Sequence, residues 1–271
     1  MCARGSLARS TGSAGSSPTE RVPPLDPRVS IDLAADALVV AALAVAAGAF
    51  AQAVTGLGFS LVCAPVMVLV LGPTIGVRLV NMCSVAVSSV GLVTHRAHVD
   101  VRAALGLLIP AILITPLVVS VVHRSNTSAL SVAAGCMTLL SVAALASGLR
   151  VRQLRGRGGA VVAGFVSATM NVIGGLSGPA VAMYGVNADW DPNRMRGTFQ
   201  LYFLALNTVA VIALGPLRIG FGRAVLFALA IAVGFGIGHL LARRLSAVIV
   251  RRLVLLFAAG GGLAAIIRGI F

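Results

Sequence analysis

The sequence contains no lysine, only seven acidic residues and a single tryptophan, and charged residues make up just 10% of its 271 positions. A soluble domain carries about 25% charged residues. Hydrophobic residues account for 58% of the chain, and its mean hydropathy is +1.02. These values exclude an ordinary soluble protein and indicate a multi-pass integral protein of the cell membrane, with the lipid bilayer as a partner.

The basic residues are 21 arginines, which give a formal net charge of +14. A nucleic-acid interface needs a basic, hydrated surface with interleaved aromatic residues, whereas these arginines lie in short clusters between apolar blocks. We therefore predict no nucleic-acid partner and treat the arginines as determinants of membrane topology. Cys63, Cys83 and Cys136 lie inside apolar runs, so they are expected to be packed thiols and not a disulfide framework.

Constellations for catalysis or metal binding are also lacking. No Ser/His/Asp, Cys/His or paired-carboxylate group falls at membrane depth, so an enzyme is not expected. His95 and His98 lie in a short arginine-containing loop with only Asp100 nearby, which offers too few ligands for a metal. We predict neither a metal nor another cofactor.

Apolar blocks divide the chain. Residues 1–32 are rich in Ser, Gly, Pro and Arg and are predicted to be a disordered tail. Eight blocks are long enough to cross roughly 30 Å of hydrocarbon, namely residues 33–55, 76–94, 101–122, 127–147, 158–173, 197–215, 224–241 and 253–270. Two shorter pieces, 59–71 and 179–186, each follow a glycine cluster and are predicted to be broken or re-entrant helices.

The two glycine clusters suggest an internal repeat. Setting Gly56 on Gly175, an offset of 119, also brings Arg78 to within one residue of Arg196. We predict an all-α integral membrane protein of two homologous repeats, 33–148 and 158–271, joined by an arginine-rich linker at 149–157. Each repeat would hold four full helices and one short or re-entrant helix.

The distribution of arginine predicts the orientation of the repeats, because cytoplasmic loops carry the excess of Arg. With the tail left out, the two sides hold twelve and five arginines if the short helices cross the membrane, and nine and eight if they do not. The first arrangement gives five segments per repeat. An odd number inverts the second repeat relative to the first, as in many secondary transporters, and places both termini outside the cytoplasm.

Four motifs together resemble the sulfite exporter TauE/SafE family of membrane permeases. They are Gly56-Leu57-Gly58 followed by Pro65, Arg96-Ala97-His98-Val99-Asp100, the second cluster from Gly174 to Pro179, and the helix start Arg196-Gly197-Thr198. The resemblance extends from about Ala47 to the C-terminus. It implies a permease that exports sulfite or a related sulfur-containing or organic anion.

The glycine clusters have two interpretations. They free backbone N–H groups and begin a half-helix whose positive dipole end suits an anion, or they only let helices pack closely. Their doubling favours the first. Arg78 and Arg196, at equivalent places in the two repeats, could bind an oxyanion or extend to the membrane interface. The helices that follow have polar faces, which include Ser84, Ser88 and Asn207. These side chains could line a pathway or bond to neighbouring helices. The predicted substrate-binding residues are Gly56, Gly58, Ser60, Arg78, Asn81, Asn171, Gly175, Ser177, Gly178, Arg196 and Gln200.

The leading hypothesis is a permease for a small anion, and the alternatives are a passive anion channel and a membrane enzyme or accessory subunit. Asp36 is the only acidic residue inside a predicted span, so the carboxylate relay of proton-coupled pumps is missing. An inside-negative potential favours anion export by about 2.3 kcal/mol per charge per 100 mV, and we expect electrogenic export. His239, predicted to be buried in its span, is the remaining candidate proton carrier. No oligomeric state is assigned.

Overall fold

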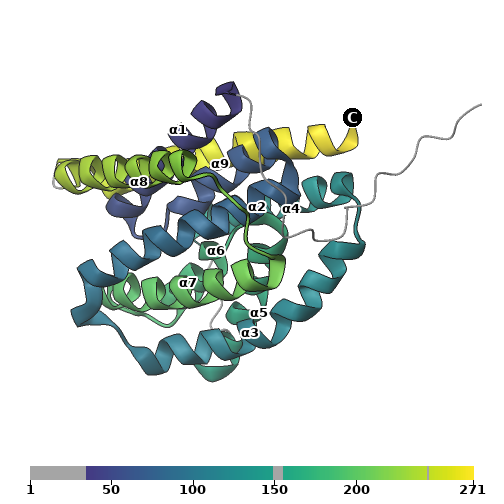
Figure 1. Cartoon of the computed structure of the whole chain (residues 1–271). Coiled ribbons are helices and arrows are strands. Elements are labelled where there is room, and N and C mark those ends of the chain that lie inside the picture. The colour runs from purple at the N-terminus through teal and green to yellow at the C-terminus, as the bar shows by residue number, and fades with distance from the viewer. Residues whose placement is uncertain (1–34, 149–154, 243) are drawn as a thin grey trace, which may run out of the picture.

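A computed structural model describes residues 35–148, 155–242 and 244–271 (Figure 1). Over these residues the chain is helical, with α1 (Ala35–Thr55), α2 (Phe59–His95), η1 (Arg96–His98), α3 (Val101–Arg124), α4 (Thr127–Ser147), α5 (Gly156–Gly174), α6 (Gly178–Asn187), α7 (Pro192–Leu214), α8 (Phe221–Leu241) and α9 (Ala247–Ile270). The predicted tail at 1–32 and most of the predicted linker at 149–157 lie outside the described residues. The predicted all-α class is confirmed.

Seven of the described helices are long and apolar enough to cross a membrane: α1, α2, α3, α4, α7, α8 and α9. Eight full spans were predicted, and α5 is the one that does not qualify. Its 19 residues include five glycines and Arg157, which lower its hydropathy. Ten of its residues are buried, because one face of α5 packs along α3. The other face, which includes Val161, Val162, Phe165 and Val166, is exposed.

Helix α2 consists of two helices joined by a sharp turn at Gly72. The φ of 77° and ψ of 164° at Gly72 fall in a region open almost only to glycine. Past the turn, a Cβ on Gly76 would lie 2.5 Å from the Met67 carbonyl oxygen, although nine residues of straight helix span about 13 Å. The first half of α2 (residues 59–71) and its second half (residues 73–95) therefore fold back on each other, as the separate short and full helices predicted there require.

Both predicted glycine breaks end a helix. α1 stops at Thr55 and α5 at Gly174, and each is followed by a glycine with positive φ, 82° at Gly56 and 71° at Gly175. A left-handed glycine is the usual stop for a helix because it has no Cβ to clash. A short helix then begins after each break, the first half of α2 at Phe59 and the ten-residue α6 at Gly178.

The helices pack in pairs along their small residues. α1 lies along α8 near the top of Figure 1 and α3 along α5 near the bottom, while α4 pairs with α9 and α2 with α7. A Cβ on Gly234 of α8 would collide with the Ala46 carbonyl of α1, and one on Gly164 of α5 would collide with the Leu107 carbonyl of α3. Glycine at these contacts lets the backbones approach closely, as is common in membrane proteins.

Polar contacts between helix termini define one end of the bundle. Arg194 at the start of α7 pairs with Asp100 before α3 (2.6 Å), and Arg155 before α5 pairs with Asp189 after α6 (3.1 Å). Arg251 in the first turns of α9 donates to the Leu145 carbonyl near the end of α4 (2.7 Å). We name this the arginine-rich end; its described arginines are Arg96, Arg102, Arg155, Arg157, Arg194, Arg196, Arg244, Arg251 and Arg252. The opposite end has Arg78, Arg124, Arg218, Arg223 and Arg268.

Candidate functional site

The two glycine breaks meet inside the bundle. Gly178 at the start of α6 faces the first break, where a Cβ added to it would lie 3.5 Å from the Leu57 carbonyl oxygen and 3.8 Å from the Ser60 hydroxyl oxygen. Leu57 and Ser60 precede and begin the first half of α2. Two helix starts that are 119 residues apart in the sequence therefore lie side by side.

A narrow cavity of about 10 Å³ lies at this junction, and we name it the central cavity. Its polar lining consists of Gln52, Ser60, Ser84, Ser88, Ser177 and Asn207, all at most 6% exposed. Leu57, Phe59, Val87, Gly178 and Phe203 complete the wall. The lining offers four serine hydroxyls and the Gln52 amide as donors, while the Asn207 Nδ2 already donates to the Phe203 carbonyl. It includes no carboxylate, and the serine donors suit a small anion.

Helix dipoles add to this electrostatic preference. The first half of α2 and α6 both begin at the central cavity, and neither is capped by the side chain of its N-cap residue, Gly58 or Ser177. The Phe59 N–H is instead bound by the Gln52 Oε1 (3.1 Å). Each helix N-terminus carries about half a positive charge from its aligned peptide dipoles, so two positive ends converge on one buried space.

A larger cavity of about 210 Å³ connects the junction with the arginine-rich end, and we name it the access cavity. Thr55, Gly58 and Gly178 lie at its base, and Gly148 and Arg251 line it toward the arginine-rich end. The remaining lining is mostly apolar, from Leu57, Leu61, Ala144, Leu145, Pro179, Ala182, Met183, Val186, Met195, Val254 and Leu255. The central cavity is thus approached from one end of the bundle.

The structure divides the predicted site residues among several places. Gly58, Ser60, Ser177 and Gly178 lie at the two cavities. Gly56, Arg196 and Gln200 lie toward the arginine-rich end. There Arg196 donates to the Val54 carbonyl and Gln200 to the Gly56 carbonyl, each at 3.3 Å. These two side chains hold the end of α1, whose free carbonyls attract donors.

The other predicted residues lie beyond the second break. Asn171 donates from Nδ2 to the Oδ1 of Asn81 (2.9 Å), and both side chains are fully buried. Gly175 packs against Val80. Arg78 lies in a separate pocket with His123. Asn81, Asn171, Gly175 and Arg78 therefore do not line the central cavity.

Gln52 was not predicted as a site residue. Its side chain reaches across the break to the start of the next helix, a contact that hydropathy does not indicate. The repeat offset offered a signal, since the offset of 119 places Gln52 on Asn171. The same offset places Ser88 on Asn207, and both line the central cavity.

The prediction that His239 is buried is wrong. Its side chain is exposed on α8, because Gly234 and Gly238 occupy the face of α8 that contacts α1. Asp36 in the first turn of α1 is also exposed. Among the described residues, the histidine with a buried unpartnered ring nitrogen is His123, through its Nε2.

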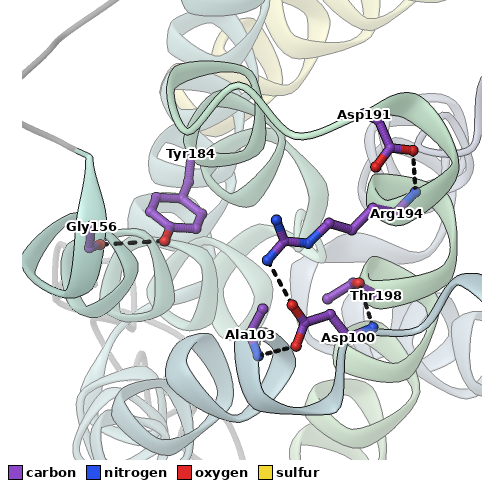
Figure 2. A network of polar contacts seen from close by, with 7 residues as sticks. All are labelled: Asp100, Ala103, Gly156, Tyr184, Asp191, Arg194 and Thr198. Atoms are coloured by element: carbon purple, nitrogen blue, oxygen red, sulfur yellow. Dashed lines mark hydrogen bonds and ion pairs between the residues drawn. The ribbon is translucent and has the colours of Figure 1, made fainter.

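A polar network fixes α3 to α7 at the arginine-rich end (Figure 2). The Asp100 carboxylate accepts from the Ala103 N–H (2.9 Å) and pairs with Arg194, while the Asp100 N–H donates to the Thr198 hydroxyl (3.0 Å). The Arg194 guanidinium lies 4.4 Å from the centre of the Trp190 ring. The Ala103 hydrogen bond and, after it, Arg194 hold the pKa of Asp100 below its usual value.

A sequence model of the family described as sulfite exporter TauE/SafE matches residues 40–265, most of the chain and all of the cavity residues named above. The chain matches no curated protein and no solved structure.

Proposed function

The chain belongs to the sulfite exporter TauE/SafE family, and from that premise we propose that it is a permease that moves a small anion through the central cavity. Family membership and seven membrane-capable helices make it a multi-pass membrane protein. One observation carries the proposal: two half-helix N-termini from distant parts of the chain converge on a buried cavity lined by neutral donors. Discontinuous helices of this kind bind anionic groups in other transporters.

The substrate proposed is sulfite or a related sulfur-containing or organic anion. The Ser60 and Ser177 hydroxyls come from the two breaks, and Ser84 and Ser88 from the second half of α2. Together with backbone N–H groups they would donate to the oxygens of an oxyanion.

Helix pairing supports two inverted repeats. Suppose that α1, the first half of α2, the second half of α2, α3 and α4 correspond in this order to α5, α6, α7, α8 and α9. Exchanging the two repeats then replaces the packed pair α1–α8 by the pair α5–α3, which is also packed. α4–α9 and the pair formed by α2 and α7 map onto themselves. α1 ends near Arg196 at the arginine-rich end, whereas α5 begins there. On this correspondence, equivalent helices would run in opposite directions.

An asymmetry between the repeats supports alternating access. α4 contacts α6 over only part of its length, and the access cavity lies between these two helices and α9. The equivalent helix α9 packs closely on the first half of α2, where a Cβ on Gly261 would lie 2.5 Å from the Pro65 Cβ. We infer that this conformation opens to the arginine-rich end, which is cytoplasmic by the positive-inside rule. In the alternate conformation α4 would pack closely on α6 and α9 would move away from the first half of α2, which would open the other end.

The test is transport by purified protein in liposomes, scanned across sulfite, sulfate, thiosulfate, sulfonates and carboxylates. A permease gives saturable uptake and counter-flow, because each transport cycle carries bound substrate across. Unitary currents without counter-flow would establish the passive channel instead. Failure of every anion in the panel would contradict the proposal.

We also propose that export is driven by the membrane potential. No acidic side chain lines either cavity, and the exposed position of His239 removes it as an internal proton carrier. With voltage clamped by potassium and valinomycin, we expect export to follow the voltage and to depend little on the pH gradient. Transport that ignores voltage and follows the pH gradient would contradict this mode of coupling.

A further inference from the structure

A polar stripe follows one face of the second half of α2. Its members are Thr74, Arg78, Asn81, Ser84 and Ser88, whose three- and four-residue spacing places them above one another on a helix. Ser84 and Ser88 line the central cavity, whereas Thr74 and Arg78 line another pocket. Ten residues of helix separate Thr74 from Ser84, about 15 Å. The stripe thus leads from the central cavity toward the opposite end of the bundle.

The pocket at the end of this stripe is narrow, with a volume of about 10 Å³, and we name it the Arg78 pocket. Pro73 and Thr74 come from the first turn of the second half of α2, and Val122 and His123 from the last turn of α3. Val77, Leu130, Val172, Ile173 and Leu214 close it with apolar surface from α2, α4, α5 and α7. The walls come from both proposed repeats, as they do at the central cavity.

Arg78 is a largely buried residue, and no carboxylate pairs with its guanidinium among the described residues. Only 8% of the residue is exposed, and its Nε is buried with no hydrogen-bond partner. Asp100, Asp189 and Asp191 lie at the arginine-rich end, and Asp36 is exposed on α1. An unpaired charge inside a membrane protein is costly, so a counter-charge is expected in this pocket.

His123 adds a second donor to the same pocket. Its Nε2 is buried and has no partner. The start of the second half of α2 at Pro73 adds a positive helix end. A guanidinium presents two parallel N–H groups that match two oxygens of one oxyanion, while an imidazole N–H and the Thr74 hydroxyl can reach a third oxygen.

We propose that the Arg78 pocket is a second anion site, which takes a small oxyanion on the side of the membrane opposite to the access cavity. Its place on the export route depends on the proposed function, whereas anion binding beside Arg78 does not. The enclosed walls favour a free oxyanion over the phosphate of a lipid, which would need a path for its acyl chains.

The test is equilibrium binding of sulfite to the full-length protein in a non-ionic detergent. The wild type binds two sulfite ions, whereas Arg78→Gln binds one, with at least a tenfold loss at the other site. Arg124→Gln is the matched control, because Arg124 is an exposed arginine next to His123, and it retains two. Gly178→Val, which fills the central cavity, retains the Arg78-dependent site. If Arg78→Gln binds as many sulfite ions as the wild type, the proposal is overturned, even if the protein transports anions. If the wild type binds one sulfite ion and Arg78→Gln binds none, the proposal is supported, even if no transport is observed.

Thermal unfolding separates this role from a purely structural one. Without added anion, Arg78→Gln should melt no lower than the wild type, because removing an unpaired buried charge relieves a cost. Sulfite should then raise the melting temperature of Gly178→Val and leave that of Gly178→Val combined with Arg78→Gln unchanged. A large loss of stability in anion-free Arg78→Gln, or an Arg78-dependent stabilisation by phosphatidylglycerol and not by sulfite, would overturn the proposal.

Discussion

At the scale of single residues, the two glycines that flank the junction have different roles. A Cβ on Gly58 would lie 2.7 Å from the Ala51 Cβ and 2.9 Å from its carbonyl carbon, so Gly58 allows the first half of α2 to pack against α1. Gly178 has only ordinary contact distances and lines both cavities. The packing interpretation of the glycine clusters therefore applies to Gly58, and the substrate-site interpretation applies to Gly178.

Gly178→Val should reduce anion transport at least tenfold while changing the melting temperature little, because the side chain enters the cavity and not a packed contact. Gly58→Val should instead destabilise the fold through the clash with Ala51. Transport rate and thermal unfolding of both variants check this difference. Gly106→Val, where an added Cβ meets nothing within 4 Å, is the control. A folded Gly178→Val protein with normal transport would show that the junction is not the substrate path.

Asp100 makes stability depend on pH. Its folded pKa is lowered, chiefly by the Ala103 N–H and then by Arg194, so its stabilisation is full above the ordinary aspartate pKa of about 3.9 and is lost as the pH falls through the lowered value. At neutral pH Asp100→Asn should cost up to about 1 kcal/mol, because the Asn amide oxygen can keep the helix cap while the charge pair with Arg194 is lost. Melting temperatures of the two proteins should converge in acid. An equal difference at every pH would contradict this assignment.

At the scale of helices, Gly72 determines whether α2 is a hairpin or one long rod. Its φ and ψ are strained for any other residue, and an added Cβ would meet nothing within 4 Å. Gly72→Ala should therefore lose roughly 1–3 kcal/mol from backbone strain alone. Gly106→Ala, in the open and inside α3, should be neutral or stabilising. Equal melting temperatures for the two variants would indicate that α2 does not turn at Gly72.

Most helices could be predicted from apolar length, and the differences have local causes. α7 begins at Pro192, five residues before the predicted start, because Asp191 caps it by accepting from the Asn193 and Arg194 N–H groups. α9 begins at Ala247, not 253, since its Arg251 bonds to the Leu145 carbonyl at the bundle end. A hydropathy criterion excludes such charged first turns although they are helical.

The candidate site was only partly predictable for a geometric reason. Local sequence marks a glycine break, so Gly58, Ser60, Ser177 and Gly178 could be found. Which other side chains reach the break depends on how the two proposed repeats pack together, and local sequence does not give this packing. Arg78 and Arg196 are equivalent by offset, yet they lie toward opposite ends of the bundle, as an inverted pair would.

At the scale of the whole molecule, the arginine distribution predicts sidedness. Cysteines introduced singly at Arg157 and Phe271, both exposed, test it in a background without the four native cysteines. The position-157 cysteine should react with a membrane-impermeant reagent only after the cytoplasmic face is opened, and the position-271 cysteine in intact cells. Labelling of both from the same side would rule out an odd number of crossings in the second repeat.

The central claim is that the two glycine breaks form one anion site, and anomalous diffraction from crystals soaked in selenite tests it most directly. Selenite has the shape and charge of sulfite, and selenium scatters anomalously. A peak is predicted within hydrogen-bond reach of the Ser60 and Ser177 hydroxyls, at the N-terminal ends of the first half of α2 and of α6. Selenium peaks elsewhere, with none at this junction in crystals of protein that transports selenite, would contradict it.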